Sequence, residues 1–460
     1  MKSVRLFLMT LIIAAFTMNA QAQKVSKEYK KTANSIIQEA LKDTATFERL
    51  TYLGDRFGHR FSGSQSLEDA IDWIIEEMKS DGLENVRGQD VMVPHWVRGD
   101  ESATMISPRK QSLPMLGLGG SIGTPAEGIT AEVLVVRDFE ELQKRADEAK
   151  GKIVLFNLPF QGYGNTVQIR TQGAIEASKA GAVASLIRSV GDFSMKTAHT
   201  GMMRYADDVR KIPHAAITSE DAEMIHRISE RGEKIEVHLY MEARTLPDAQ
   251  SRNVIAEIRG TEEPEEVVVL GGHIDSWDVG TGMMDDGGGC VASWEALNII
   301  KRLGLKPRRT IRVVLWTNEE NGLRGGVTYK DSVAKTNNLE NHILAMESDG
   351  GVFKPRGFGF GGNDEAYEIM KDISSLLKPI DADLMRRGGG GADISPLMRL
   401  GVPGMGLLVE GEKYFWYHHT DADTIDKLDR DEFNQCTAAM AVMAFVVADM
   451  EQDLPKDLKE

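Results

Sequence analysis

The sequence predicts an α/β protein built around a mostly parallel sheet that helices cover. Short apolar segments rich in Val, Ile and Leu recur through the second half of the chain, as buried parallel strands do. Segments with helical periodicity separate them, and this alternation is typical of parallel α/β sheets. A different α/β stretch, residues 112–244, interrupts the order. We therefore expect one main domain with an inserted domain.

The first 22 residues have the features of a secretory signal. Lys2 and Arg5 precede a short apolar run, and small residues flank Gln21 at the expected cleavage site. The run is too short to span a membrane, and no later segment is long and apolar enough to do so. We expect a secreted or periplasmic chain that has no membrane association once the signal is removed.

Composition narrows the function classes. The formal net charge of the chain is −16, and no basic stripe is present, so nucleic acid is not an expected partner. The sequence contains only two cysteines, Cys290 and Cys436, which do not make a disulfide framework. We expect both to be buried free thiols.

Residues 23–111 form the N-terminal part of the main domain. Residues 24–50 are charged and helix-prone without a strong apolar face, and the sequence leaves open whether this start is a removable prosegment. A clear amphipathic helix follows, with Ser66 as its expected N-cap and Gly82 as its expected end. Residues 85–99 read as a strand.

The insert, residues 112–244, has strand and helix patterns of its own. Strands are expected at 152–157, 182–187 and 212–218, and a helix at 220–228. No cluster of metal-ligating residue types follows these strands. We expect the insert to shape access to a site rather than to supply ligands.

Residues 245–460 carry the chemistry. Strands are expected at 267–270, 311–316, 342–347 and 404–410, and polar side chains follow each of them. The four clusters comprise His273, Asp275, Asp285 and Asp286; Glu319 and Glu320; Glu347 and Asp349; and His418, His419, Asp421 and Asp423. Each cluster alone is weak evidence, because solvated loops have similar composition. Sites form beyond the carboxyl ends of strands in such sheets, so the clusters are expected to meet.

Imidazole nitrogens and carboxylate oxygens together suit zinc. Two zinc ions about 3.5–4 Å apart share a bridging ligand, and a further carboxylate must stay off the metal to act as a base. The clusters contain enough histidines and carboxylates for such a pair, so the sequence predicts a zinc site at this edge of the sheet.

The motifs HIDSWD, DDGGG, NEENG, ESDGG and HHTDADT resemble those of the M28 family of zinc peptidases. The resemblance covers about residues 30–450 and includes the insert, which looks like a protease-associated domain. It implies a sheet of the zinc-exopeptidase type and an exported di-zinc exopeptidase that hydrolyses dipeptides or short peptides. It also implies a homodimer.

The resemblance implies five zinc ligands in two groups that share one bridging carboxylate: His273 with Asp349, Glu320 with His419, and Asp285 as the bridge. Two further carboxylates have other implied roles. Glu319 would be the general base for a metal-activated water, and Asp275 would orient the His273 imidazole.

For three of these positions a nearby residue is the alternative: Asp286 for Asp285, Glu347 for Asp349, and His418 for His419. The family pattern favours the residues assigned above, which leaves His418 as a wall of the substrate site.

A free substrate carboxylate would need a cation. Arg324, Arg386 and Arg387 are the candidates, and ordinary surface charge is the alternative for all three. Two other readings of the whole chain remain. One is a single-zinc acyltransferase similar to glutaminyl cyclases, and the other is a receptor-like relative without catalysis.

Overall fold

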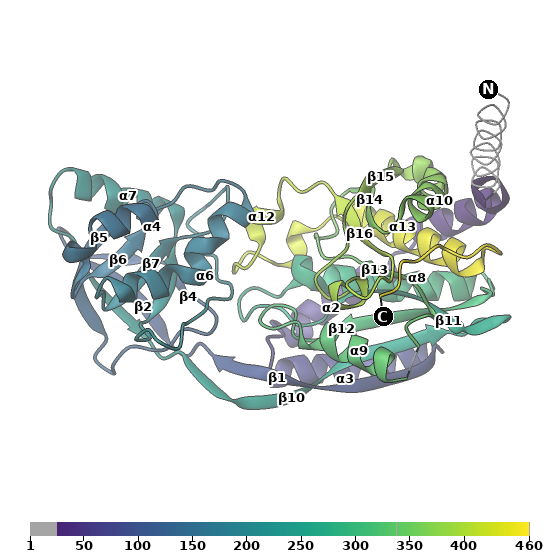
Figure 1. Ribbon diagram of the computed structural model, residues 1–460, viewed down its shortest axis with the longest axis horizontal. Helices are drawn as coiled ribbons and strands as arrows, with labels where there is room; N and C mark the ends of the chain where they lie inside the picture. The colour runs from purple at the N-terminus through teal and green to yellow at the C-terminus, as the bar shows by residue number, and fades with distance from the viewer. Residues whose placement is uncertain (1–24, 337, 460) are drawn as a thin grey trace, which may run out of the picture.

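The computed structural model describes residues 25–336 and 338–459, so the expected signal peptide lies outside the described residues. The chain forms two lobes that a long two-stranded ribbon connects (Figure 1). The ribbon consists of β1 (Glu84–Val97) and β10 (Arg244–Ile258), which pair antiparallel. The insert therefore leaves and re-enters the larger lobe through neighbouring strands.

The larger lobe contains an eight-stranded sheet in the order β1-β10-β12-β11-β13-β16-β14-β15. Its other strands are β11 (Glu263–His273), β12 (Arg309–Trp316), β13 (His342–Glu347), β14 (Pro355–Gly361), β15 (Leu384–Arg387) and β16 (Gly404–Val409). The central strands β12, β11, β13 and β16 run parallel, while β10 and β14 join them antiparallel. The predicted helix-covered parallel sheet is confirmed for this centre.

Helices cover both faces of this sheet. Val268 and Leu270 of β11 face one hydrophobic core, while Val267 and Val269 face another, as the period of two in a strand requires. The first core also contains a helix at residues 25–41, α2 (Ala45–Phe57), α3 (Gln65–Ser80), α8 (Gly288–Arg302), α10 (Asp364–Ser374) and α13 (Arg430–Asp449). The second core contains α9 (Arg324–Lys335) and α11 (Ser395–Met398). Shorter helical segments are η1 (Met283–Gly287), η2 (Ser375–Ile380), α12 (Tyr414–Tyr417) and η3 (Ile425–Lys427).

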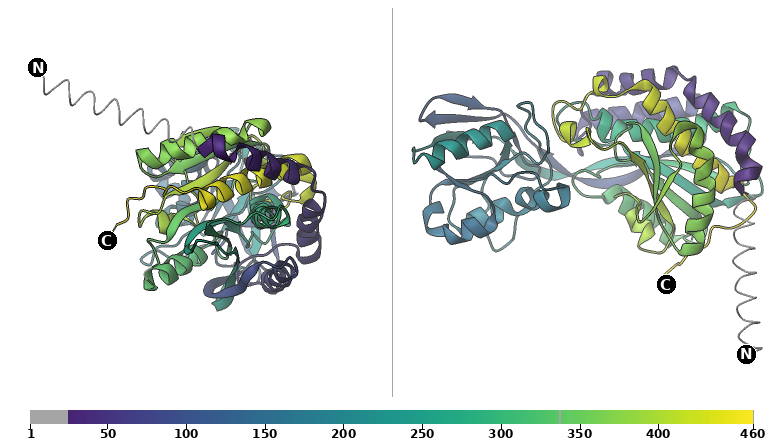
Figure 2. Two further views of the ribbon diagram at one scale, coloured as in Figure 1. Left: turned by 90° about the vertical axis from the view of Figure 1, so that its right-hand side faces the viewer. Right: turned by 90° about the horizontal axis from the view of Figure 1, so that it is seen from above.

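The expectation that residues 24–50 lack a strong apolar face is wrong. The helix at residues 25–41 buries Tyr29, Ile36 and Ile37 in the first core. The Tyr29 hydroxyl donates to Asp449 on α13, and Figure 2 shows the two helices side by side. The regular spacing of its apolar residues is hard to recognise in the sequence, because many Lys and Glu residues lie between them on the solvent face.

The amphipathic helix is confirmed as α3, but Ser66 is not its N-cap. The Ser64 hydroxyl accepts the backbone N–H of Leu67, while the Ser66 hydroxyl donates to the carbonyl of His59. The helix therefore begins at Gln65, two residues earlier than an N-cap at Ser66 predicts. Gly82 does follow the end of the helix, with a positive φ of 71°.

The smaller lobe contains a second eight-stranded sheet, in the order β3-β2-β9-β5-β6-β7-β8-β4. Its strands are β2 (Glu101–Ser107), β3 (Gln111–Leu113), β4 (Met115–Gly117), β5 (Ile129–Val136), β6 (Ile153–Phe156), β7 (Ala184–Arg188), β8 (His214–Ile217) and β9 (Glu236–Met241). Its helices are α4 (Phe139–Lys144), α5 (Ala146–Ala149), α6 (Tyr163–Lys179) and α7 (Ser219–Glu230). The strands expected from sequence correspond to β6, β7 and β8.

The predicted start of the insert at residue 112 falls inside this second sheet. β2 pairs with both β3 and β9, so Glu101–Ser107 belongs to the smaller lobe. We place the start of the insert directly after Val97, where β1 ends. The sequence missed this boundary because β1, β2 and β3 are all strands, and composition does not change between them.

Two further expectations concern the whole chain. Cys290 and Cys436 are both free and buried, as predicted. Among the described residues, no helix is long and apolar enough to cross a membrane.

His342 at the start of β13 generates a prediction for stability. Its Nδ1 lies 2.9 Å from the Asn338 carbonyl, and its Nε2 lies 3.0 Å from the Tyr329 hydroxyl. Burial lowers the pKa of His342 to about 4. Between pH 6.5 and pH 4 the unfolded chain then binds more protons at this residue, so the free energy of unfolding falls as the pH decreases.

We expect His342→Gln to remove about 2 kcal/mol of the difference in unfolding free energy between pH 7 and pH 5. Urea unfolding of the wild type and the variant at both pH values measures this difference. An identical pH dependence in the two proteins would contradict the assignment.

Candidate metal centre

The polar clusters meet at one edge of the larger sheet. His273 is the last residue of β11, while Glu319 and Glu320 follow β12. Asp349 follows β13, and His419 comes from the segment after α12. Strand order brings them together, because β12, β11 and β13 are parallel neighbours.

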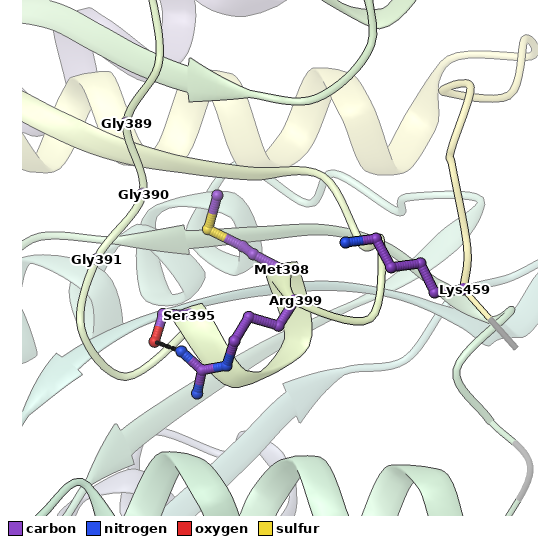
Figure 3. Close-up of a pocket in the computed structure, with 7 residues that line it drawn as sticks. All are labelled: Gly389, Gly390, Gly391, Ser395, Met398, Arg399 and Lys459. Carbon is purple, nitrogen blue, oxygen red and sulfur yellow. Dashed lines mark hydrogen bonds between the residues drawn. The ribbon is translucent and has the colours of Figure 1, made fainter.

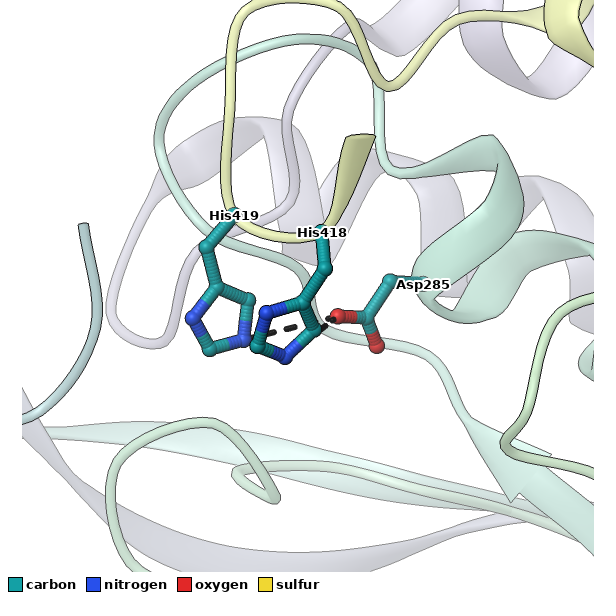
Figure 4. Close-up of side chains that lie close together, drawn as sticks. All are labelled: Asp285, His418 and His419. Carbon is teal, nitrogen blue, oxygen red and sulfur yellow. Dashed lines mark ion pairs between the residues drawn. The ribbon is translucent and has the colours of Figure 1, made fainter. Parts of the chain in front are cut away.

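The Asp285 carboxylate lies between His273 and His419. Its Oδ1 is 3.1 Å from Nε2 of His273, and its Oδ2 is 3.4 Å from Nε2 of His419. The stacked ring of His418 lies beside His419, with its Nε2 3.7 Å from the same Oδ2 (Figure 4). Each oxygen of one carboxylate therefore faces a different histidine.

A second carboxylate accompanies each histidine. Asp349 Oδ1 lies 3.2 Å from His273 Nε2, and Glu320 Oε2 lies 3.1 Å from His419 Nε2. The result is two groups of three side chains that share Asp285. Apart from the half-buried Asp349, these side chains are buried.

The neighbours that sequence could not separate have other partners. Asp286 accepts backbone N–H groups from His273 and Gly289 through its two oxygens. Glu347, the last residue of β13, accepts the backbone N–H of Ile394. Both carboxylates thus support the loops around the centre, while Asp285 and Asp349 face into it.

Asp275 contacts the His273 imidazole through its backbone carbonyl and not, as expected, through its carboxylate. His273 Nδ1 lies 2.9 Å from the backbone carbonyl of Asp275 but 3.9 Å from its carboxylate. The carboxylate instead accepts the backbone N–H groups of Glu319 and Glu320. The carbonyl is therefore the group that orients the imidazole, because the carboxylate is already engaged with the loop after β12.

Two residues that stabilise the loops of the site through hydrogen bonds were not predicted to do so from the sequence. The fully buried Arg60 donates to the carbonyls of Ile274, Thr281 and Gly282. Asp423, noted in sequence only as part of a motif, accepts the backbone N–H groups of Met283, Met284 and Asp285. No spacing rule links Arg60 to a loop more than two hundred positions away, so sequence offered no signal for it.

The smaller lobe also holds the centre. Thr200 donates its backbone N–H to the carbonyl of His419 at 2.9 Å, and its own carbonyl lies 3.3 Å from His419 Nδ1. Nδ1 of His199 lies 2.8 Å from the carbonyl of His418. His419 has a positive φ of 61°, which is costly for a residue with a side chain. The insert therefore fixes both the backbone and the ring of His419.

The charges of the site call for a cation. The buried oxygens Asp285 Oδ2 and Glu320 Oε1 have no hydrogen-bond donor among the described residues. Burial, together with the charges of Asp349, Asp275 and Asp285, raises the pKa of Glu319 to about 8 against the opposing effect of His273. Unpaired buried carboxylates are expensive. Imidazole nitrogens with free carboxylate oxygens are the donor set that zinc prefers, so the residues present fit zinc.

The three arginines considered for a substrate carboxylate lie elsewhere. Arg324 pairs with Asp248 at 2.6 Å, and Arg387 pairs with Asp364. Arg386 and Arg387 are exposed on β15, the edge strand. These positions favour the alternative reading, ordinary surface charge.

The glycine loop beside these arginines separates the centre from a surface pocket. Its lining comprises Gly389, Gly390, Gly391, Ser395, Met398, Arg399 and Lys459 (Figure 3). A Cβ at Gly391 would lie 2.1 Å from the carboxyl carbon of Glu347, so only glycine fits there. The loop thus packs against Glu347 on one side and lines the open pocket on the other.

Comparisons with known proteins agree with this geometry. The model of peptidase family M28 matches residues 253–444. Carboxypeptidase Q of Mus musculus is 50% identical over 431 residues, which cover 93% of this chain and 91% of that protein. Carboxypeptidase Q of Homo sapiens is 52% identical over 411 residues, which cover 89% and 87%.

Solved structures agree as well. A peptidase M28 precursor from Shewanella amazonensis has a TM-score of 0.89 at 36% identity, covering 95% of this chain and 100% of that one. A zinc aminopeptidase from Bacillus subtilis has a TM-score of 0.67 at 19% identity, covering 88% and 95%, and this likeness shows the fold alone.

The contact of His199 with the His418 carbonyl generates a prediction. We expect His199→Leu to weaken zinc binding at the group that contains His419 by about 10–100-fold, because the loop loses its support. His199→Asn keeps a donor near the position of Nδ1 and should retain most of the affinity. Chelator titration with measurement of residual zinc tests both. Equal zinc loss in the two variants, or none in either, would contradict this role.

Proposed function

Because the chain belongs to peptidase family M28 and is a zinc-dependent exopeptidase, we propose that it is a di-zinc enzyme that hydrolyses dipeptides or other short peptides. The observation that carries the proposal is the position of Asp285. Its two oxygens face two different histidines, and each histidine has a carboxylate of its own.

In this proposal His273 and Asp349 bind one zinc ion, Glu320 and His419 bind the other, and Asp285 bridges them. The distances from His273 Nε2 to Asp285 and Asp349, those from His419 Nε2 to Asp285 and Glu320, and the oxygens of Asp285 and Glu320 that accept no hydrogen bond support it. Zinc in such a centre lowers the pKa of a water molecule and polarises the scissile carbonyl.

Glu319 is the proposed general base. Asp275 anchors its backbone N–H at 3.0 Å, and its carboxylate is more exposed than that of Glu320. In this role Glu319 accepts the proton of the attacking water and then delivers it to the leaving amine nitrogen. His418 forms a wall of the same site beside Asp285.

The names of the relatives bear on the class of substrate. Proteins that match most of this chain are called Carboxypeptidase Q, so we infer that peptides with a free carboxyl terminus are the substrates. A single-zinc acyltransferase would leave the shared position of Asp285 without purpose. A non-catalytic relative would not need the full set of ligands.

Three further proposals follow from the sequence and its family. The chain is exported by its first 22 residues, which lie outside the described part of the structure, and is secreted or periplasmic. The smaller lobe is a protease-associated domain. The protein is a homodimer without nucleic-acid or membrane partners, and sedimentation of the purified chain tests this assembly.

Adjacent glutamates with different roles give the sharpest prediction. We expect Glu319→Gln to lower kcat by about 10²–10⁴-fold, since it removes the proton acceptor, while zinc content stays at the wild-type level. Glu320→Gln should instead lose zinc, because it removes a charged ligand. Zinc stoichiometry and kcat measured on both variants decide the matter, and zinc loss from Glu319→Gln alone would mean that the roles are reversed.

The bridging role of Asp285 gives a second prediction. We expect wild-type protein to bind two zinc ions per chain and Asp285→Asn to weaken both sites, because both lose the same charge. Asp421→Asn, at an exposed residue of the HHTDADT motif, is the matched control and should keep both ions. Metal analysis and anomalous scattering measure the ions. A single ion in zinc-replete wild type, or loss of only one in Asp285→Asn, would refute the bridge.

A further inference from the structure

Arg170 is a buried cation of the insert that lacks an anionic partner. It lies on α6 and is 6% exposed. Its Nη2 donates to the Tyr163 hydroxyl at 2.8 Å, and its Nη1 donates to the Thr200 carbonyl at 3.4 Å. Its buried Nε has no acceptor, and no Asp or Glu of the described residues forms an ion pair with it. Both of its acceptors are neutral.

Such an arrangement is unusual for a buried guanidinium. Removing this charge from water is unfavourable unless an opposite charge or a full set of hydrogen bonds compensates it. Arg309, which is fully buried in the larger lobe, pairs with Glu266 and Asp453. Arg60 also forms no ion pair among the described residues, but its Nε, Nη1 and Nη2 each donate to a backbone carbonyl. The Nε of Arg170 has no acceptor among the described residues, and this unsatisfied donor of a buried cation favours an anion from another molecule.

The guanidinium lies next to the metal centre. Its Nη1 and the Nδ1 of His419 both approach the carbonyl of Thr200. Tyr163, whose hydroxyl accepts from Nη2, has its ring edge-on to His418 at 5.4 Å between centroids.

Gly201 lets the guanidinium of Arg170 lie close to the backbone. A Cβ at Gly201 would lie 2.3 Å from Nη1 of Arg170 and 2.7 Å from its Nε. The planar group therefore packs flat against Gly201 while further N–H groups stay unused. Of the five N–H donors of an arginine, two are engaged here.

We propose that Arg170 binds the free α-carboxylate of the substrate residue that leaves after cleavage. This proposal rests on the proposed function and deepens it. A guanidinium with free N–H groups binds a carboxylate through paired, charge-assisted hydrogen bonds. In a dipeptide the α-carboxylate belongs to the residue directly after the scissile bond, and consecutive Cα atoms are only about 3.8 Å apart. A cation adjacent to the ligand His419 suits that short reach.

The substrate class follows from this position. Peptides with one free residue beyond the scissile bond bring the missing negative charge, whereas amides and longer peptides do not bring it to that place. The insert then selects the substrate as well as shaping access, and the enzyme is a carboxypeptidase or dipeptidase rather than a general aminopeptidase.

The test compares a dipeptide with the same dipeptide as its C-terminal amide, using zinc-loaded protein. We expect wild type to favour the free dipeptide strongly in kcat/KM. Arg170→Gln should lower kcat/KM for the free dipeptide by about 10²-fold, mainly through KM, since hydrogen bonds to charged groups are involved. The amide should change by less than about threefold, so the preference disappears.

Arg188→Gln is the matched control, because this arginine of the insert already pairs with Glu223. It should leave the preference of the enzyme unchanged. Arg170→Lys keeps the charge but loses the paired N–H groups, and should lose about tenfold of the preference. It also decides the question if Arg170→Gln fails to fold or to retain zinc.

An equal loss on both substrates in the Arg170 variants, or an unchanged preference, would overturn the role of Arg170. A wild type that hydrolyses both substrates equally would also overturn it while leaving the proposed peptidase function intact. A zinc-loaded wild type inactive on both would overturn the proposed function itself.

Discussion

The gathering of buried carboxylates beyond β11, β12 and β13 is the constraint on which the larger lobe depends. Ionised carboxylates repel one another, and burial makes each of them costly. Asp275, Asp286 and Asp423 are compensated by backbone N–H groups from neighbouring loops. Asp285 and Glu320 retain oxygens without donors. The first set thus stabilises the loops in place, and the second set is left for cations.

This division explains several local features of the fold. A Cβ at Gly272 would lie 2.1 Å from Oδ2 of Asp286, so the strand end must be glycine for that carboxylate to reach the backbone of His273. Among the residues named here as partners of these loops, Arg60 alone has a positively charged side chain. It donates hydrogen bonds to backbone carbonyls rather than to carboxylates. The strands of the sheet determine where the residues of the site lie, and the hydrogen bonds of the loops determine the directions of their side chains.

Sequence predicted the parts of the molecule that repeat a pattern. The strands at 267–270, 311–316 and 342–347 and the clusters behind them were visible because apolar runs and acidic loops are local signals. Residue chemistry alone did not separate Asp285 from Asp286, since adjacent acids differ only in which donors they meet, and only the family pattern favoured Asp285. The contributions of Arg60, His199 and Arg170 come from distant segments, and no periodicity connects them to the site. The start of the insert was predicted wrongly for a similar reason, because the successive strands β1 and β2 belong to different sheets.

The β1–β10 ribbon has a topological consequence. Val97 and Arg244 face each other in its register, so the insert starts and ends at one point of the larger sheet. A tight hairpin turn is enough to join such positions, and a long excursion there adds little closure entropy. The smaller lobe is therefore, in topology, an insertion between two paired strands that interrupts neither of them. The larger lobe nevertheless depends on it, because Thr200 of the smaller lobe supports His419.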